Sequence, residues 1–253
     1  MEINLTGRTA IVTGATGELG RVISMTLAEC GADVAIHYNS NRQKADEPQR
    51  KIQALGRRAI TVSADITDQE SVLSMRDWLN EQQFYPDIVV DNAVVQYVWK
   101  SVLEQNPEDY ESQFRSCVMQ NVFMAKAFVP HMIERNSGRF IGINTECAMQ
   151  MLPNQSAYVA GKRGMDGVLK VLAKEIGPHN ITVNEIAPGW TISEKDRAAN
   201  NESSPEYEKN VPLRRRGTDK EIANAVAFIA SDLAGFITGA YIPVAGGSVM
   251  PCI

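Results

Sequence analysis

The chain has 253 residues, of which 44% are hydrophobic and 22% charged, a balance typical of globular proteins and unlike that of disordered or fibrous chains. Its 25 Lys and Arg residues against 30 Asp and Glu residues give a net charge of −5, which leaves no broad cationic field to hold a nucleic-acid backbone. We therefore expect one domain over residues 1–253 and no nucleic-acid partner.

Neither a metal site nor a membrane segment is indicated. The N-terminus lacks the pattern of a signal peptide, and no apolar run is long enough to cross a bilayer. The cysteines and histidines have no paired spacing of the kind that marks zinc or redox sites; they are Cys30, Cys117, Cys147 and Cys252, and His37, His131 and His179. We expect a cytoplasmic protein with reduced thiols, no metal and no membrane contact.

Short β-branched runs alternate with longer helical patterns along most of the chain. This rhythm predicts βαβ units and an α/β fold of the Rossmann type, with a doubly wound, seven-stranded parallel sheet and helices on both faces. The expected strands are Arg8–Thr13, Asp33–Tyr38, Arg58–Ser63, Asp87–Asp91, Arg139–Asn144, Thr182–Ile186 and Tyr241–Val244.

A glycine-rich turn follows the first expected strand and precedes a helical pattern. Such a turn lets the backbone approach a pyrophosphate closely, while the free N–H groups of the helix end stabilise its oxygens. The position between a first strand and a first helix favours a dinucleotide site. Its expected contacts are Gly14, Thr16, Gly17, Leu19 and Gly20.

The second expected strand ends without a carboxylate, in His37-Tyr38-Asn39-Ser40-Asn41-Arg42. An acidic side chain there would accept a ribose hydroxyl and repel a 2′-phosphate. Ser40, Asn41 and Arg42 could instead donate to a phosphate, so NADP(H) is favoured over NAD(H). A solvated Arg42 at the start of a helix is the alternative.

The polar segment 191–212 interrupts the alternation of strands and helices. Long connections in compact domains are often binding loops, so we expect this excursion to enclose substrate, a mobile surface loop being the alternative. Close behind it, Arg214-Arg215-Arg216 is expected to form a solvated surface turn, although it could touch an anionic substrate.

Tyr158 and Lys162 stand four residues apart at the start of a long helical pattern, which places them on one helix face. A neighbouring cation favours the phenolate and is expected to lower the pKa of the Tyr158 phenol, making it a usable proton donor or acceptor. Such a pair without further context is more often packing and surface charge, but the glycine turn upstream favours catalysis.

Together these motifs resemble the short-chain dehydrogenase/reductase family, in the single-domain branch that includes the 3-oxoacyl-acyl-carrier-protein reductases and many sugar and polyol dehydrogenases. The resemblance covers essentially the whole chain. It implies that Tyr158 and Lys162 are the family's catalytic pair, that Thr145 orients the substrate carbonyl, and that Asn121 helps to hold a proton-relay water. The further cofactor contacts it implies are Asp65, Ile66, Asn92, Ala93, Pro188, Gly189 and Ser193.

The chain departs from the family pattern at several of these positions. Glu18 stands in the glycine turn; cofactor binding should survive because Glu18 can point to solvent, although a carboxylate near the pyrophosphate could weaken affinity. Val94 replaces a glycine, so the local turn must differ if its backbone needs a conformation that only glycine adopts. Thr145 replaces Ser and Ser193 replaces Thr, both of which keep a hydroxyl. Glu146 is expected to face water, the alternative being a contact with a polar or cationic substrate group.

The resemblance implies transfer of a hydride between nicotinamide and a carbonyl or secondary alcohol, with Tyr158 as general acid/base. A 3-oxoacyl thioester or small ketone is the first expectation for the substrate, and a sugar or polyol is the second. A sensor or scaffold that binds cofactor without turnover is the alternative of another class. The family further implies a homotetramer, or a dimer, and the apolar stretch 118–129 is compatible with an interface or with burial inside the monomer.

Overall fold

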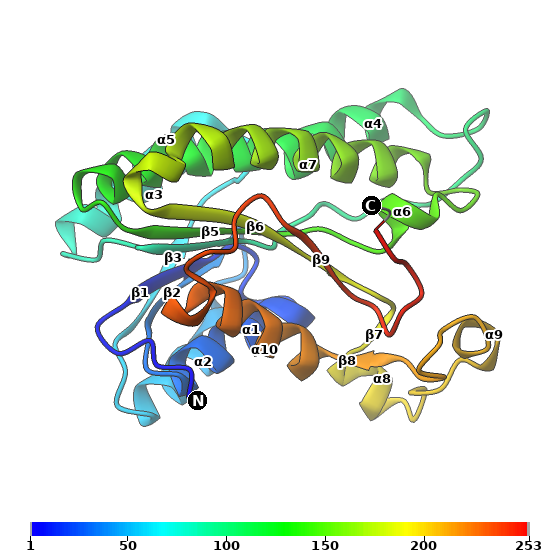
Figure 1. Cartoon of the computed structure of the whole chain (residues 1–253), viewed down its shortest axis with the longest axis horizontal. Helices are drawn as coiled ribbons and strands as arrows, with labels where there is room; N and C mark the ends of the chain where they lie inside the picture. Colours follow the sequence, from blue (N-terminus) through cyan, green and yellow to red (C-terminus); the bar gives the residue numbers. More distant parts are fainter. Residues whose placement is uncertain (1, 252–253) are drawn as a thin grey trace.

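The computed structural model describes residues 2–251 and contains a parallel sheet of seven strands in the order β3-β2-β1-β4-β5-β6-β9 (Figure 1). The strands are β1 Thr9–Val12, β2 Asp33–Tyr38, β3 Ala59–Ser63, β4 Ile88–Asp91, β5 Gly138–Ile143, β6 Ile181–Pro188 and β9 Tyr241–Val244. The Rossmann-type prediction is confirmed, and each expected strand is present to within two residues at its ends.

Helices cover both faces of the sheet. The longer ones are α1 Glu18–Glu29, α2 Gln43–Ala54, α3 Gln69–Glu81, α5 Gln120–Glu134, α7 Ser156–Ile176 and α10 Asp219–Ala230. Figure 1 shows α1, α2 and α10 below the sheet, and α3, α5 and α7 above it. A short helix α4 (Pro107–Gln113) runs through a π-helical turn, η1 (Phe114–Met119), into α5.

Successive side chains of each strand point to opposite faces of the sheet, and they contribute to two separate hydrophobic cores, one on each face. In β1, Ala10 and Val12 pack with Ile23 of α1 and Val226 of α10 in the lower core. Ile11 points the other way, into the core that α3, α5 and α7 close. Full burial on both faces explains why these strands are continuous apolar runs.

The excursion is structured rather than a bare loop. It contains β7 (Thr191–Ile192), α8 (Glu194–Ala198) and α9 (Pro205–Glu208), and β7 pairs in parallel with β8 (Gly217–Thr218). In Figure 1 these elements lie at one end of the molecule, near the short helix α6 (Cys147–Gln150).

The expectation of a solvated turn at Arg214–Arg216 is correct for two residues and wrong for the third. Arg214 and Arg215 are exposed, but Arg216 is only 2% exposed. Its guanidinium pairs with Asp196 at 3.0 Å, donates to the Thr191 carbonyl and lies over the Trp190 ring. Arg216 therefore holds the excursion to the body of the protein.

Within residues 2–251, no helix is both long and apolar enough to span a bilayer.

Candidate active site

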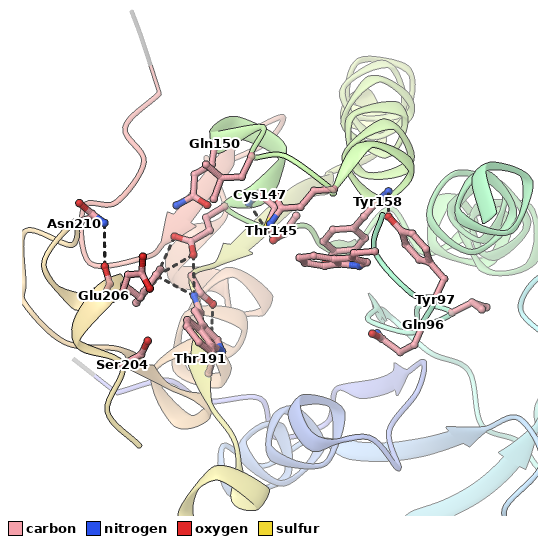
Figure 2. A pocket seen from close by; sticks show the side chains of 18 residues that line it. Gln96, Tyr97, Thr145, Cys147, Gln150, Tyr158, Thr191, Ser204, Glu206 and Asn210 are labelled. Atoms are coloured by element: carbon pink, nitrogen blue, oxygen red, sulfur yellow. Dashed lines mark hydrogen bonds between the residues drawn. The ribbon is translucent and has the colours of Figure 1, made fainter. Parts of the chain in front are cut away.

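Two cavities of about 790 Å³ each meet above the carboxyl ends of the central strands. The first, here called the groove, runs from the glycine turn to α7; the second, the pocket, lies between the groove and the excursion. Thr145 and Tyr158 line both. These two hydroxyls therefore stand where the cavities join, and Figure 2 shows them on one side of the pocket.

Most of the predicted cofactor contacts line the groove. They are Gly14, Thr16, Gly17, Leu19, Gly20, Asp65, Ile66, Asn92, Ala93, Tyr158, Lys162, Pro188 and Gly189. Residues from five separate stretches of the chain thus converge on one surface, as expected where parallel strands end at the same edge of a sheet.

The glycine turn has backbone geometry that side chains would block. Gly14 has φ +61°, and a Cβ at Gly20 would lie 2.3 Å from the Gly14 carbonyl oxygen. The first turn of α1 has no side-chain cap, whereas Asp68 caps α3 and Thr218 caps α10. The free N–H groups at the start of α1 fit a pyrophosphate, which supports a dinucleotide in the groove.

Glu18 is the residue of this turn that could repel phosphate. Its side chain is 32% exposed, with a carboxylate oxygen 3.5 Å from the Arg21 guanidinium and another 3.9 Å from the Lys195 ammonium. These cations offset its charge at the mouth of the groove.

His37 supports the glycine turn from below, a role that sequence reasoning missed. Its Nδ1 accepts from the Gly14 N–H at 3.1 Å, so its Nε2–H donates to the Ala64 carbonyl at 3.0 Å. Burial lowers the pKa of this imidazole to about 4, against a partial opposing effect of the Ala64 carbonyl. His37 is neutral near pH 7, as this pair of bonds requires.

The predicted phosphate-binding residues Ser40, Asn41 and Arg42, at the end of β2, do not line the groove itself. Asn39 is among the lining residues, whereas Ser40 and Asn41 are exposed beyond it. Arg42 borders a separate hollow beside β3 and carries no side-chain cap to α2.

Tyr158 is held by two aromatic residues from the loop after β4. The Tyr97 hydroxyl accepts from the Tyr158 backbone N–H at 2.8 Å, and the Trp99 ring stacks on the phenol with centroids 6.0 Å apart. Burial raises the pKa of Tyr158 above its ordinary value, while a hydrogen bond with the Thr145 hydroxyl lowers it in part.

The predicted lowering of that pKa by Lys162 is therefore not observed. The Lys162 ammonium donates to the Ile143 carbonyl at 2.5 Å and lies 5.8 Å from the centre of the Tyr158 ring. At that distance its effect does not outweigh the desolvation of the phenol.

Asn121 is the second residue of α5 and lies just after the π-helical turn. Its Nδ2 donates to the Cys117 carbonyl at 2.6 Å, while its Oδ1 is buried without a partner. π-Helical turns occur often at functional sites because they displace one residue from the helical register.

The expectation that Glu146 faces water is wrong. The residue is 3% exposed, and its carboxylate accepts from the Trp190 N–H at 3.0 Å and the Tyr207 hydroxyl at 2.9 Å. The Ser248 hydroxyl also donates to it. A buried carboxylate must be paired with donors, and here these come from three distant parts of the chain.

Two other departures have clear structural consequences. Val94 lines the groove without a positive φ angle, so valine fits this turn without strain. Ser193 caps α8, and its hydroxyl donates to Asp196 at 2.9 Å instead of facing the groove.

The pocket is lined by the loop after β4, the stretch after β5, the start of α7 and the excursion, which was expected to enclose substrate. Trp99 and Trp190 supply apolar walls. In the described part of the chain, no group of three His, Cys, Asp or Glu side chains could hold a metal ion.

Comparison with known proteins identifies relatives over nearly the whole chain. A family model described as Enoyl-(Acyl carrier protein) reductase matches residues 14–248. The 3-oxoacyl-(acyl-carrier-protein) reductase FabG of Staphylococcus aureus is 33% identical, over 96% of this chain and 98% of that protein. L-rhamnose 1-dehydrogenase (NAD(P)(+)) of a Sphingomonas strain is 30% identical over 96% of both chains.

Solved structures are also similar to this chain over nearly its whole length. The gluconate 5-dehydrogenase of Burkholderia cenocepacia, solved in complex with NADP and tartrate, superposes with a TM-score of 0.90. It is 27% identical, over 98% of this chain and 97% of that one.

Proposed function

The chain belongs to the short-chain dehydrogenase/reductase family of oxidoreductases, and from that premise we propose that it is an NADP(H)-dependent reductase of carbonyl compounds. The observation that carries the proposal is the placement of Thr145 and Tyr158 on both cavities. A carbonyl group at this junction would meet two hydroxyl donors on one side and the cofactor groove on the other.

When bound, the nicotinamide supplies or accepts the hydride at the carbonyl carbon. The remaining tasks belong to this chain. Tyr158 gives its proton to the carbonyl oxygen in reduction, and its raised pKa keeps that proton in place at neutral pH. Thr145 donates to the same oxygen and holds it within reach of the phenol.

Lys162 and Asn121 would serve proton transfer behind Tyr158. Lys162 is 3% exposed and lines the groove beside the Tyr158 ring. Its charge stabilises the phenolate that remains after the proton has left. The unpartnered Asn121 Oδ1 is a buried acceptor suited to an ordered water, through which the proton could be restored.

NADP(H) is proposed over NAD(H) because β2 ends without an acidic side chain. Asn39 lines the groove there, and Ser40, Asn41 and Arg42 follow it on the surface. NADP in the related gluconate 5-dehydrogenase supports the same choice.

The proposed substrate is a 3-oxoacyl thioester or a small ketone, as the name of the FabG relative suggests. A sugar or polyol dehydrogenase is the second candidate, favoured by the polar Gln96, Gln150 and Asn210 in the pocket wall and by the rhamnose dehydrogenase relative. The presence of the complete Tyr158, Lys162 and Asn121 set argues against a sensor without turnover. We also propose a cytoplasmic homotetramer.

Cofactor consumption at 340 nm over a panel of ketones, 3-oxoacyl thioesters and sugars tests the proposal, after fluorescence titration with NADPH and NADH. We expect tighter binding of NADPH and turnover with members of the ketone or thioester set. Tighter binding of NADH would contradict the assignment of Ser40–Arg42. Cofactor binding without turnover over the whole panel would contradict the enzyme and favour the sensor.

A further inference from the structure

The charge of the pocket wall sets it apart from the groove. Among the described residues that line the pocket none is Lys, Arg or His, whereas two are glutamates, Glu146 and Glu206. The groove carries both signs, with Lys162 and Lys195 as well as Glu18 and Asp65. The carboxylates of Glu146 and Glu206 therefore have no cationic side chain beside them in the described lining of the pocket.

The two carboxylates differ in burial and in hydrogen bonding. Glu146 is buried and saturated with donors from Trp190, Tyr207 and Ser248, so it cannot move away or accept a cationic partner without breaking those bonds. Glu206 is exposed, and its carboxylate has no hydrogen bond or ion pair with any described residue. Figure 2 shows it across the pocket from Tyr158.

The polar groups that remain in the wall are amides and hydroxyls. Gln155 is 8% exposed, and its Oε1 is buried without a partner. An unpaired buried acceptor favours a ligand that brings a hydroxyl or N–H and disfavours one that brings another acceptor. The unpaired Gln155 oxygen and the two glutamates of the wall therefore both disfavour a carboxylate on the ligand.

From these contacts we infer that the pocket selects uncharged carbonyl substrates and rejects those whose far end is a carboxylate, with Glu206 as a specificity-determining residue. The inference rests on the proposed function, since it concerns the substrate of the same site. It favours the acyl portion of an oxoacyl thioester, a neutral ketone or a neutral sugar, and it disfavours sugar acids.

The sharpest test uses two ketones that differ only in charge. In 6-oxoheptanamide and 6-oxoheptanoate a methyl ketone and a seven-carbon chain are shared, and the far end is either a carboxamide or a carboxylate of nearly the same shape. We expect the wild-type protein to prefer the amide in kcat/KM by about tenfold at low salt, because like charges in a partly desolvated pocket repel.

Glu206→Gln should reduce this preference several-fold by improving the acid relative to the amide, and added salt should reduce it in the wild type by screening. Glu202→Gln is the matched control, because it removes the same charge from an exposed position of the excursion outside the pocket lining. It should keep the wild-type ratio. Equal use of acid and amide by the wild type, or an unchanged ratio in Glu206→Gln, would overturn the inference.

An equal change in both variants would also overturn it, since the effect would then belong to the overall charge of the excursion. If neither ketone is turned over, the result counts against the proposed reductase function for these two substrates. The inference about charge is then tested separately, by calorimetric titration of each ketone into the complex of the protein with NADP⁺. Tighter binding of the amide that depends on Glu206 supports it, and equal binding contradicts it.

Discussion

Tyr158 reaches both cavities with its hydroxyl although its ring is largely enclosed by other side chains. Its hydroxyl borders both cavities, yet burial raises the pKa of the phenol. A protonated phenol suits reduction, in which the residue gives up a proton. In the proposed mechanism, oxidation of an alcohol requires the phenolate, which a raised pKa disfavours at neutral pH.

The proposed preference for NADP(H) rests most directly on Arg42. Arg42→Ala should weaken NADPH binding by about tenfold and leave NADH binding nearly unchanged, because only the 2′-phosphate gains from a charge-assisted bond. Fluorescence titration with both cofactors measures this. Arg50→Ala, which removes an arginine from α2, the helix that begins directly after Arg42, serves as the control. Equal losses for NADPH and NADH would show that Arg42 supports the fold rather than the phosphate.

The neutral His37 makes the stability of the protein depend on pH. Its pKa falls from the ordinary 6.5 to about 4 on folding, so its contribution is fully present above pH 6.5 and is lost as the pH falls to about 4. That contribution is on the order of 3 kcal/mol. Urea unfolding of the wild type and His37→Gln from pH 7.5 to 4.5 should show the wild-type advantage shrinking over this window. A constant difference would contradict the account.

Sequence reasoning at the residue scale succeeded where a motif dictates backbone geometry. Gly14 and Gly20 were predicted because a tight turn next to a pyrophosphate excludes side chains, and the structure has that turn. It failed for Glu146 and Arg216, whose charges suggested exposure. Both are buried by partners far away in the chain, and no local pattern reveals such partners.

At the scale of elements, the excursion is the part that shapes the pocket. Tyr207 in α9 donates to Glu146 and accepts from the Trp190 N–H, which ties the excursion to the stretch after β5. Arg216 fixes its other side through Asp196. The excursion therefore forms one wall of the pocket and is fixed to the body of the protein by the contacts of Tyr207 and Arg216.

Tyr207→Phe should loosen this wall. The lost hydroxyl bonds to a carboxylate, and its removal should cost about 1–3 kcal/mol of local stability. We expect faster trypsin cleavage within residues 191–212 and a several-fold higher KM, with a smaller effect on kcat. Tyr110→Phe, which removes a hydroxyl bonded to Ser156 outside the excursion, should leave cleavage there unchanged. Equal cleavage of the wild type and Tyr207→Phe would show that the tie does not hold the excursion.

The seven strands were predictable because burial on both faces produces apolar runs with clear ends. The small β7–β8 pair and the π-helical turn before Asn121 were not. Two-residue strands have no periodicity, and a π-helical turn depends on packing between helices rather than on residue type.

On the scale of the whole molecule, the sheet separates two cores, and the carboxyl ends of its strands form the site. The stretch 118–129 contributes Phe123, Met124 and Phe128 to the upper core, so burial inside the monomer accounts for much of its apolar character. Phe114 and Val171 remain 52% and 55% exposed on the outer side of the same layer.

These exposed residues are candidates for contact between subunits. We expect light scattering to give a mass four times the 27.8 kDa of one chain, and Phe114→Glu to shift it toward smaller species by placing a charge in an apolar contact. Lys174→Glu is a charge-changing control near the end of α7. A wild-type mass equal to that of one chain would contradict the proposed assembly.

The account depends above all on Tyr158 as the proton donor, and Tyr158→Phe tests this most directly because it removes one oxygen and keeps the ring that stacks on Trp99. With the best ketone of the panel, kcat should fall by at least about 100-fold while the dissociation constant of NADPH changes less than threefold. A variant that binds NADPH and retains most of its turnover would contradict the assignment of Tyr158.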